Sequence, residues 1–412
     1  MSGSILIENI GLLQTATGNG KRRGEAQGEN VKLKNAAVLI EGGLIKEITS
    51  DGKRPKGAGS ADLVLDAEKN LVTPGLVDAH THLVFGGYRQ GEIPLKLKGA
   101  SYIDILKAGG GILDTVRKTR ETPADGLYEK SMGFLDEMLA LGTTSCEAKS
   151  GYGLDFDNEI KQLEIVSNLT KAHPVEIVPT YMGAHAVPVE FKGSASEYID
   201  MVCEKVMPYI AGHKLAEYCD IFCEDSAFDR GQSEKYLRRA KELGFGIKIH
   251  ADEIKAIGGA RLAGELSADS AEHLIATDED GMNALAEGGT IAVLLPGTSF
   301  YLDKPYAKAR RMIELGIPVA LATDFNPGSC PSLNMQLIIN MGYLKYRMTP
   351  EEILTAVTIN AANAMGRGDT IGTLEEGKQG DLVIWDAKDF EMLCYRFGSN
   401  LALQVIKKGE VV

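Results

Sequence analysis

Residues 75–83 read GLVDAHTHL, a short apolar run that ends in two histidines, His80 and His82. Side chains alternate between the two faces of a strand, so both imidazoles share one face if this run is a strand. Seven more runs of this kind follow along the chain, each short and rich in strand-forming residues. The eight expected strands cover residues 75–83, 143–150, 175–184, 218–224, 245–251, 267–274, 290–297 and 317–324.

Longer stretches with a helical period separate these runs. An alternation of short strands and helices is typical of βα units around a parallel sheet. Eight such units within about 300 residues favour a (β/α)8 barrel with insertions. The clearest expected helices cover residues 124–141, 158–171, 232–243, 254–265 and 306–315.

Both ends of the chain have a different pattern, in which apolar and polar residues alternate in short bursts between Gly, Lys and Asp clusters. This pattern predicts small antiparallel strands. The two ends can pair into one sheet, which makes a small discontinuous domain. We therefore expect residues 1–72 and 367–412 to form one β domain, and residues 73–366 to form the barrel.

The composition limits the kinds of binding partner and the cellular compartment that we expect. The 412 residues carry 44 Lys and Arg against 57 Asp and Glu, a formal charge of −13. This balance argues against a nucleic-acid or anionic-membrane partner. We see neither an export signal nor an apolar run long enough to span a bilayer. Six cysteines without a CxxC pair fit a reducing cytoplasm.

The histidines mark the place where chemistry is expected. In a (β/α)8 barrel, catalytic groups lie at the carboxyl ends of the strands. Four polar residues at these ends form a set of three nitrogens and one oxygen that suits Zn²⁺ or Fe²⁺. The alternative is that some are buried histidines with ordinary hydrogen-bond partners. The four expected ligands are His80, His82, His250 and Asp324.

The other four histidines carry different expectations. His273 ends the sixth expected strand and His185 follows the third, whereas His173 and His213 are expected on the surface. Lys149, after the second strand, is the only candidate for a lysine that bridges two metals. We expect Lys149 to be structural or solvated, and therefore predict one metal ion.

Several motifs carry a family resemblance over nearly the whole chain. PGLVDAHTHL, HADE at 250–253, ATDFNPGS at 322–329 and GKQGDLVIWD at 377–386 resemble the amidohydrolase superfamily. Its members are metal-dependent hydrolases with a (β/α)8 barrel and a small β-sandwich made from both termini. The finer motifs HLVFGGYRQGE, GGGILDTVRKTRE, KSGYGLD, MGAHAVP and LPGTSFYL resemble the imidazolonepropionase family within it.

That resemblance implies a reaction and a set of roles. The reaction is hydrolysis of the ring C–N bond of 4-imidazolone-5-propanoate to N-formimidoyl-L-glutamate, and a homodimer is implied as well. Asp324 is expected to move a proton, His273 to orient or deprotonate water, and Glu253 to contact a ring nitrogen. In sequence alone, Glu253 also fits the first turn of a helix that begins at residue 254.

The substrate carboxylate calls for a guanidinium, because arginine can donate two parallel hydrogen bonds to it. Arg89, in the loop after the first strand, is our choice. Loop residues with possible polar contacts to the substrate complete the expected site. They are Tyr102, Tyr152 and His185, of which the last two could donate through a phenol and an imidazole, and Asn326, Gly328 and Ser329, which can offer an amide, a backbone N–H and a hydroxyl.

Two rival functions remain open at this stage. A related amidohydrolase that deaminates a cytosine-like or guanine-like ring would carry similar metal motifs, but its reaction would release ammonia. A barrel that has lost catalysis and acts as a scaffold would usually lack the metal ligands.

Overall fold

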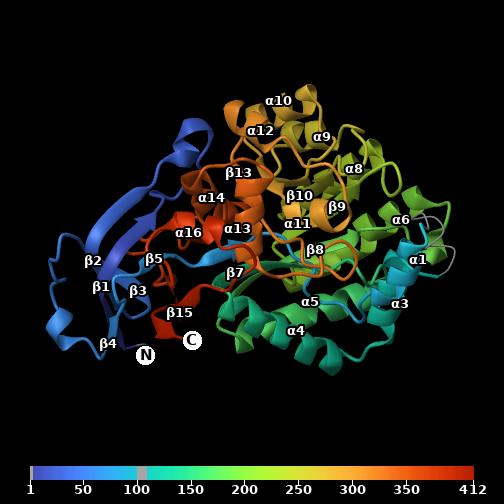
Figure 1. Cartoon of the computed structure of the whole chain (residues 1–412). Helices are drawn as coiled ribbons and strands as arrows, with labels where there is room; N and C mark the ends of the chain where they lie inside the picture. The colour runs from blue at the N-terminus through green and yellow to red at the C-terminus, as the bar shows by residue number, and fades with distance from the viewer. Residues whose placement is uncertain (1–2, 100–108) are drawn as a thin grey trace.

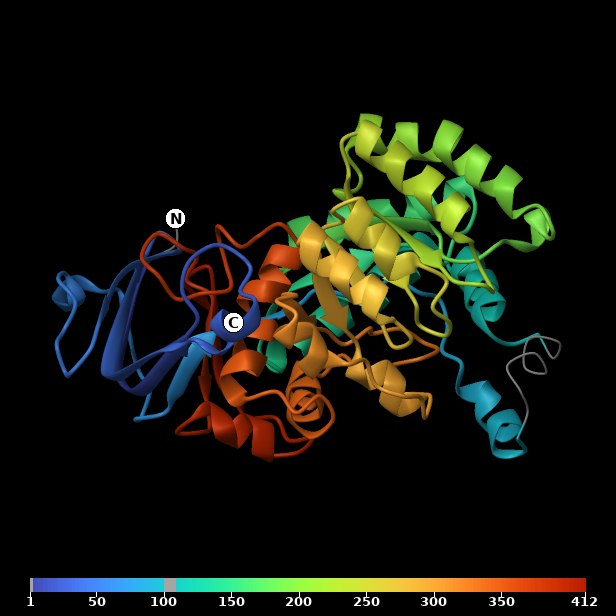
Figure 2. The same ribbon diagram turned by 90° about the horizontal axis from the view of Figure 1, so that it is seen from above.

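The computed structural model describes residues 3–99 and 109–412 of the chain. Figure 1 shows a barrel surrounded by helices, with a separate sheet beside it that holds strands from both chain ends. Viewed from above in Figure 2, the first and the last strands lie on the same side of the barrel. The expected α/β architecture is confirmed.

Eight parallel strands form the barrel sheet, in chain order from β6 to β13. Each expected strand is present, although several are shorter than the apolar runs that predicted them. The strands are β6 (Leu76–Asp78), β7 (Thr143–Lys149), β8 (Glu176–Ala184), β9 (Tyr218–Cys223), β10 (Gly246–Ala251), β11 (Ser270–His273), β12 (Ile291–Leu294) and β13 (Val319–Leu321).

The barrel closes where the chain beyond β6 meets the chain beyond β13. The Asp324 N–H donates to the His80 carbonyl at 3.0 Å, and the His82 N–H donates to the Phe325 carbonyl at 2.9 Å. The buried carboxylate of Asp78 accepts hydrogen bonds from the Thr323 N–H at 3.0 Å and the Thr323 hydroxyl at 2.6 Å. This seam places the two histidines of the first run beside Asp324.

Helices cover the outside of the barrel, as the expected βα alternation requires (Figure 1). Those that follow barrel strands include α5 (Phe156–Ala172), α8 (Arg230–Glu242), α9 (Gly259–Glu265), α10 (Glu279–Gly288) and α12 (Ala309–Glu314). The remaining described α-helices are α1 (Ile93–Leu97), α3 (Ile112–Glu121), α4 (Ala124–Ala140), α6 (Ala195–Met201), α7 (Met207–His213), α11 (Pro296–Tyr301), α13 (Met335–Leu344), α14 (Pro350–Ala356), α15 (Ile359–Ala364) and α16 (Phe390–Tyr395).

Two helices begin later than the sequence predicted. Helix α9 starts at Gly259 instead of residue 254, because Gly258 takes a left-handed conformation (φ +90°) and the Asp252 carboxylate accepts the N–H of Gly259 at 3.1 Å. Helix α12 starts at Ala309 instead of residue 306. Glu253 therefore lies in a loop, so the first-turn interpretation of this carboxylate is wrong.

Strands from both ends of the chain share one eight-stranded sheet. Strand β14 pairs antiparallel with β5, which joins the two ends directly. The expectation of antiparallel pairing is only partly right, because β1 pairs parallel with β4 and β5. The strands are β1 (Ser4–Thr15), β2 (Val31–Glu41), β3 (Leu44–Thr49), β4 (Leu63–Asp66), β5 (Leu71–Pro74), β14 (Leu382–Trp385), β15 (Ala402–Lys407) and β16 (Glu410–Val411).

Trp385 joins this sheet to the barrel. Its fully buried indole donates to the Thr73 hydroxyl at 2.8 Å. The ring also packs against Gly142, just before β7, where an added Cβ would lie 2.8 Å from a ring carbon. Gly142 has φ +93°, a conformation that favours glycine. The turn before β7 therefore depends on having no side chain.

Among the residues that the structure describes, no helix is long and apolar enough to cross a membrane. All six cysteines are buried and free. His173, expected on the surface, is buried instead: its ring lies 3.2 Å from Asp136 and accepts the Val175 N–H at 3.1 Å. His213 is exposed, as expected.

We expect the variant Thr323→Val to lower the free energy of unfolding by about 1–3 kcal/mol, because it leaves a buried carboxylate oxygen of Asp78 without its hydroxyl donor. Denaturant unfolding measures this loss. Thr290→Val is the matched control, since this equally buried hydroxyl makes only a 3.4 Å contact with a carbonyl. Equal losses in both variants would contradict the role of the seam.

Candidate metal and active site

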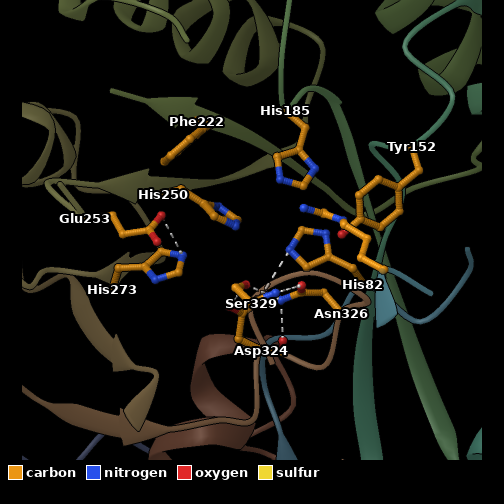
Figure 3. Close-up of a pocket in the computed structure, with 11 residues that line it drawn as sticks. His82, Tyr152, His185, Phe222, His250, Glu253, His273, Asp324, Asn326 and Ser329 are labelled. Carbon is orange, nitrogen blue, oxygen red and sulfur yellow. Dashed lines mark hydrogen bonds and ion pairs between the residues drawn. The ribbon is translucent and has the colours of Figure 1, made fainter. Parts of the chain in front are cut away.

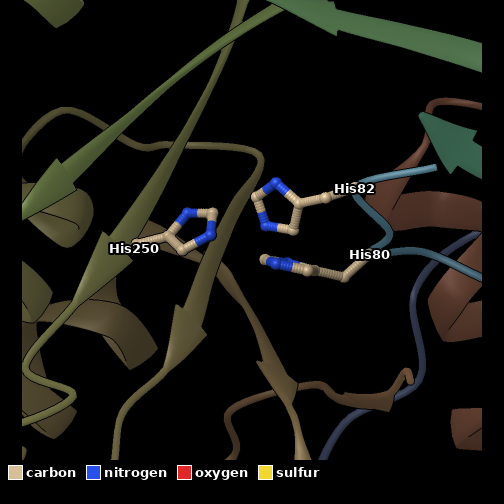
Figure 4. Close-up of side chains that lie close together, drawn as sticks. All are labelled: His80, His82 and His250. Carbon is tan, nitrogen blue, oxygen red and sulfur yellow. The ribbon is translucent and has the colours of Figure 1, made fainter. Parts of the chain in front are cut away.

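Three imidazoles lie together at the carboxyl ends of the barrel strands, and Figure 4 shows their rings turned toward a common space. His80 and His82 follow β6, and His250 comes from β10. Each offers one ligand atom, and these atoms lie within 4.8 Å of one another. All three side chains are buried, so the group has the proximity that a metal site requires.

Two carboxylates determine which nitrogens remain free. Glu272 lies 3.0 Å from Nδ1 of His80, and Asp220 lies 3.0 Å from Nδ1 of His250. A carboxylate accepts hydrogen bonds, so each Nδ1 carries the proton and each Nε2 keeps a lone pair. Neither Nε2 has a hydrogen-bond partner among the described residues, although both are buried. Histidines of metal sites are oriented in this way, so the residues fit a metal ion.

The protonation states of His80 and His82 favour the same use, whereas His250 would release a proton on binding a metal. Burial lowers the pKa of His80 and His82 well below its usual value, so both rings are neutral near pH 7. Burial also lowers the pKa of His250, but the neighbouring Asp220 carboxylate outweighs it and the net pKa is raised. Neutral imidazole is the form that binds a metal.

Asp324 lies beside the three histidines. Its Oδ1 is 3.4 Å from Nε2 of His80 and 3.6 Å from Nε2 of His82. Its other oxygen accepts the Thr298 hydroxyl at 2.5 Å. The backbone of Asp324 is left-handed, with φ +54°, where the strand gives way to the next loop. One oxygen of this carboxylate is thus held by the protein, and the other faces the histidines.

His273 and Glu253 form a second pair of groups near the histidines. Nε2 of His273 is 3.7 Å from a carboxylate oxygen of Glu253. Burial lowers the pKa of His273 to about 3 and raises that of Glu253 to about 7. His273 has φ +66°, an uncommon conformation outside glycine that tends to occur at functional sites. The neutral His273 imidazole can orient water or donate its N–H, whereas the Glu253 carboxyl group, which titrates near neutrality, can transfer protons.

Two acidic residues that were not among the predicted site residues hold the loop that carries Glu253. The Asp252 carboxylate accepts N–H groups at both Ile257 and Gly259. The Glu224 carboxylate accepts the Ile254 N–H at 2.8 Å. These contacts fix the backbone on the carboxyl side of Glu253. The sequence could have indicated this role only through the position of Glu224 and Asp252, each directly after a barrel strand.

Most of these groups line one pocket, whose empty space of about 390 Å³ includes its opening to solvent (Figure 3). It includes most of the residues expected to bind substrate, whereas Tyr102 lies outside the described residues. Phe222, at the end of β9, was missed because an aromatic residue in an apolar strand looks like core. The lining residues are His82, Arg89, Tyr152, His185, Phe222, His250, Glu253, His273, Asp324, Asn326 and Ser329.

Arg89 is held in the pocket wall from two sides. Its Nε donates to the Thr115 hydroxyl at 2.9 Å. Its guanidinium lies against Gly328, where an added Cβ would come within 2.2 Å of the guanidinium carbon. Gly328 thus makes room for the arginine, and the terminal nitrogens of Arg89 stay close to the pocket.

In the turn after Asp324, most polar groups hydrogen-bond to other groups of the same turn. Asn326 accepts the N–H groups of Gly328 and Ser329 at 2.8 and 2.7 Å, and donates to the Asp324 carbonyl at 2.7 Å. The backbone N–H that we expected Gly328 to offer a ligand is therefore already engaged, as is most of the Asn326 amide. The Ser329 hydroxyl remains at the pocket surface.

Tyr152 and His185 also face the pocket. Burial raises the pKa of Tyr152, so its phenol stays protonated and can donate. Nδ1 of His185 lies 3.2 Å from the Gly151 carbonyl and must donate to it. Burial lowers the pKa of His185 to about 3, so its other nitrogen is an acceptor. We expected His185 to act as a donor, and this geometry favours the opposite role.

Lys149 is not solvated. It lies inside the barrel with no exposed surface, and its ammonium is 2.7 Å from Asp220 and 2.8 Å from Glu147. Burial alone would lower its pKa, but these carboxylates outweigh burial and raise it. Lys149 is therefore a buried cation. Of the two roles expected for it, structural or solvated, only the structural one fits.

Residues 71–412 match the model of the Amidohydrolase family. Among solved structures, the chain resembles an adenosine deaminase from Xanthomonas campestris with bound zinc, with a TM-score of 0.69 and 19% identity over 99% of this chain and 92% of that one. Ochratoxinase from A. niger gives a TM-score of 0.72 with 18% identity, over 100% of this chain and 96% of that one. At such identities these structures show the fold alone.

Curated relatives are far more similar in sequence. The imidazolonepropionase of Caldanaerobacter subterraneus subsp. tengcongensis is 48% identical, over 100% of this chain and 99% of that protein. The imidazolonepropionase of Alkaliphilus metalliredigens is 46% identical, over 100% of this chain and 98% of the relative. Similarity at this level along the entire length shows that the chain belongs to the imidazolonepropionase family of amidohydrolases.

Proposed function

We propose that the protein hydrolyses the ring C–N bond of 4-imidazolone-5-propanoate and yields N-formimidoyl-L-glutamate. The observation that carries this proposal is the set of three buried imidazoles, two with a free Nε2, next to a pocket lined by two carboxylates and a guanidinium. Such a pocket suits a small ring that carries a negative charge.

We propose that His80, His82, His250 and Asp324 hold one divalent ion, either zinc or iron. Imidazole and carboxylate ligands suit both metals. A bound divalent ion would act as a Lewis acid and lower the pKa of a coordinated water to about 7. Two observations support this ligand set: Nε2 has no hydrogen-bond partner in His80 and His250, and Oδ1 of Asp324 faces the histidines.

The remaining acidic and basic groups would move protons. Asp324 would take a proton from the attacking water and deliver it to the leaving ring nitrogen. His273, neutral and close to Glu253, would orient the water and stabilise the negative charge that develops on the ring oxygen. Glu253 would hydrogen-bond a ring nitrogen, and its pKa of about 7 lets it do so in either protonation state.

Arg89 would bind the propionate of the substrate through its terminal nitrogens. Tyr152 would donate to the substrate and His185 would accept from it, in line with the proton positions described above. We keep Tyr102 and Ser329 as further polar contacts. Asn326 and Gly328 would contribute mainly by shaping the loop and by leaving space for Arg89.

A nucleobase aminohydrolase is the nearest alternative function, because it would use similar metal ligands. The relatives at 46–48% identity favour ring opening. A catalytically inactive scaffold is disfavoured by the intact ligand set. We also propose that the protein works in the cytoplasm, which the six free cysteines support, and that it is a homodimer, as the family resemblance implies.

The test of the function is to incubate the metal-replete protein with fresh 4-imidazolone-5-propanoate. Loss of ring absorbance should exceed spontaneous decay, the product should gain one water, and no ammonia should appear. Release of ammonia from nucleobases, together with no effect on the imidazolone, would favour the aminohydrolase.

For the ligand set, we expect His250→Ala to lose bound metal, because it removes one of three converging nitrogens. Elemental analysis of the purified variant measures this loss. His173→Ala is the matched control, since this histidine is also buried but lies outside the site. Full metal occupancy in His250→Ala would refute the assignment.

For substrate binding and catalysis, we expect two variants to affect different constants. Arg89→Ala should raise KM about tenfold to a hundredfold, because charged hydrogen bonds contribute about 1.5–3 kcal/mol. His273→Ala should mainly lower kcat, by about 10²- to 10⁴-fold. Steady-state kinetics distinguish them, with the exposed Arg311→Ala as a control for loss of a surface guanidinium. An unchanged KM in Arg89→Ala would rule out its role.

A further inference from the structure

The interior of the barrel below the three histidines contains charged side chains where such barrels usually have branched apolar ones. Five charged residues from four strands have no exposed surface at all. They are Glu147 and Lys149 of β7, Asp220 of β9, Lys248 of β10 and Glu272 of β11.

Ion pairs connect four of these residues, all except Glu272, into a network. The ammonium of Lys149 lies 2.7 Å from Asp220 and 2.8 Å from Glu147. The ammonium of Lys248 lies 2.9 Å from the other oxygen of Glu147. Lys149 thus touches a carboxylate that contacts a histidine, whereas Lys248 touches only Glu147 within ion-pair distance.

Two of the five buried charged residues contact histidines of the metal site. One oxygen of Asp220 accepts from Lys149, and the carboxylate also accepts from Nδ1 of His250. On the neighbouring strand, Glu272 accepts from Nδ1 of His80, and its other oxygen accepts from the Ser270 hydroxyl. Nδ1 of His250 lies 3.0 Å from Oδ2 of Asp220, the oxygen that accepts from Lys149, and 3.1 Å from Oδ1, so the cation and the imidazole share this carboxylate.

Stability does not account for this arrangement. Removing charges from water costs several kcal/mol per ion, and apolar residues of similar volume often stabilise a core equally well or better. Carboxylates that hydrogen-bond ligand histidines, by contrast, commonly tune metal affinity. The proposed metal site therefore explains these buried charged residues better than stability does.

We propose that Lys149 is a positioning residue of the metal site, which acts through Asp220 to orient His250. This inference rests on the proposed metal-dependent function. Without its cation, Asp220 would lose the ammonium that holds Oδ2, and its carboxylate would be free to rotate away from the imidazole. His250 would then present Nε2 less reliably to the ion.

The test compares Lys149→Met with Lys248→Met, two variants that each remove one fully buried cation from the same network. Zn²⁺ is titrated into the metal-free proteins in competition with a chromophoric chelator. We expect Lys149→Met to bind Zn²⁺ about 10- to 100-fold more weakly than wild type. Lys248→Met should stay close to wild type. At saturating metal, Lys149→Met should lower kcat and leave KM unchanged, because Lys149 does not line the pocket.

Asp220→Asn provides a second route if Lys149→Met does not fold, since it keeps the shape of the side chain and removes the charge. It should also weaken Zn²⁺ binding by about 10- to 100-fold. Equal affinities in the two lysine variants, or wild-type affinity in Asp220→Asn, would overturn the role of Lys149 and leave the proposed function standing. A wild-type protein that binds no Zn²⁺ and opens no ring would instead overturn both.

Discussion

The closure of the barrel between its first and last strands is the constraint on which the site depends. Two backbone hydrogen bonds, from Asp324 to His80 and from His82 to Phe325, join segments that are more than 200 residues apart in the chain. The same seam holds the buried Asp78 carboxylate against Thr323. Because the seam runs directly into the three histidines, any shift in it would change the distance between Asp324 and the imidazoles.

Much of the fold could be predicted from the sequence, because short apolar runs and helical periods report local structure directly. All eight barrel strands lie where those runs predicted them, and the two chain ends pair as expected. The predicted starts of α9 and α12 were wrong, and for α9 the left-handed Gly258 and the Asp252 acceptor delay the helix without changing its apolar period. The parallel pairing of β1 with β4 and β5 is a long-range property that alternation cannot reveal.

The site was predictable to the extent that its residues follow strands. The three histidines, Asp324 and His273 were found because parallel strands bring their carboxyl ends together. The buried charges below them were not, because alternation identifies the two faces of a strand but not what fills the barrel interior. Lys149, at the end of the second expected strand, was expected to be structural or solvated. Phe222 looked like core, and the engaged N–H of Gly328 depends on an Asn326 side chain whose direction no local pattern reports.

The sheet shared by both termini also has a consequence for synthesis. Strand β5 is made early, yet its partner β14 leaves the ribosome only after the entire barrel sequence. Strand β15 then brings Lys407 against the buried Asp381 and close to Ser145 of the barrel. During translation the apolar core of the N-terminal strands therefore stays incomplete until Leu382, Ile384 and Ile406 have been made. This interval is the period in which a chaperone would matter most to this chain.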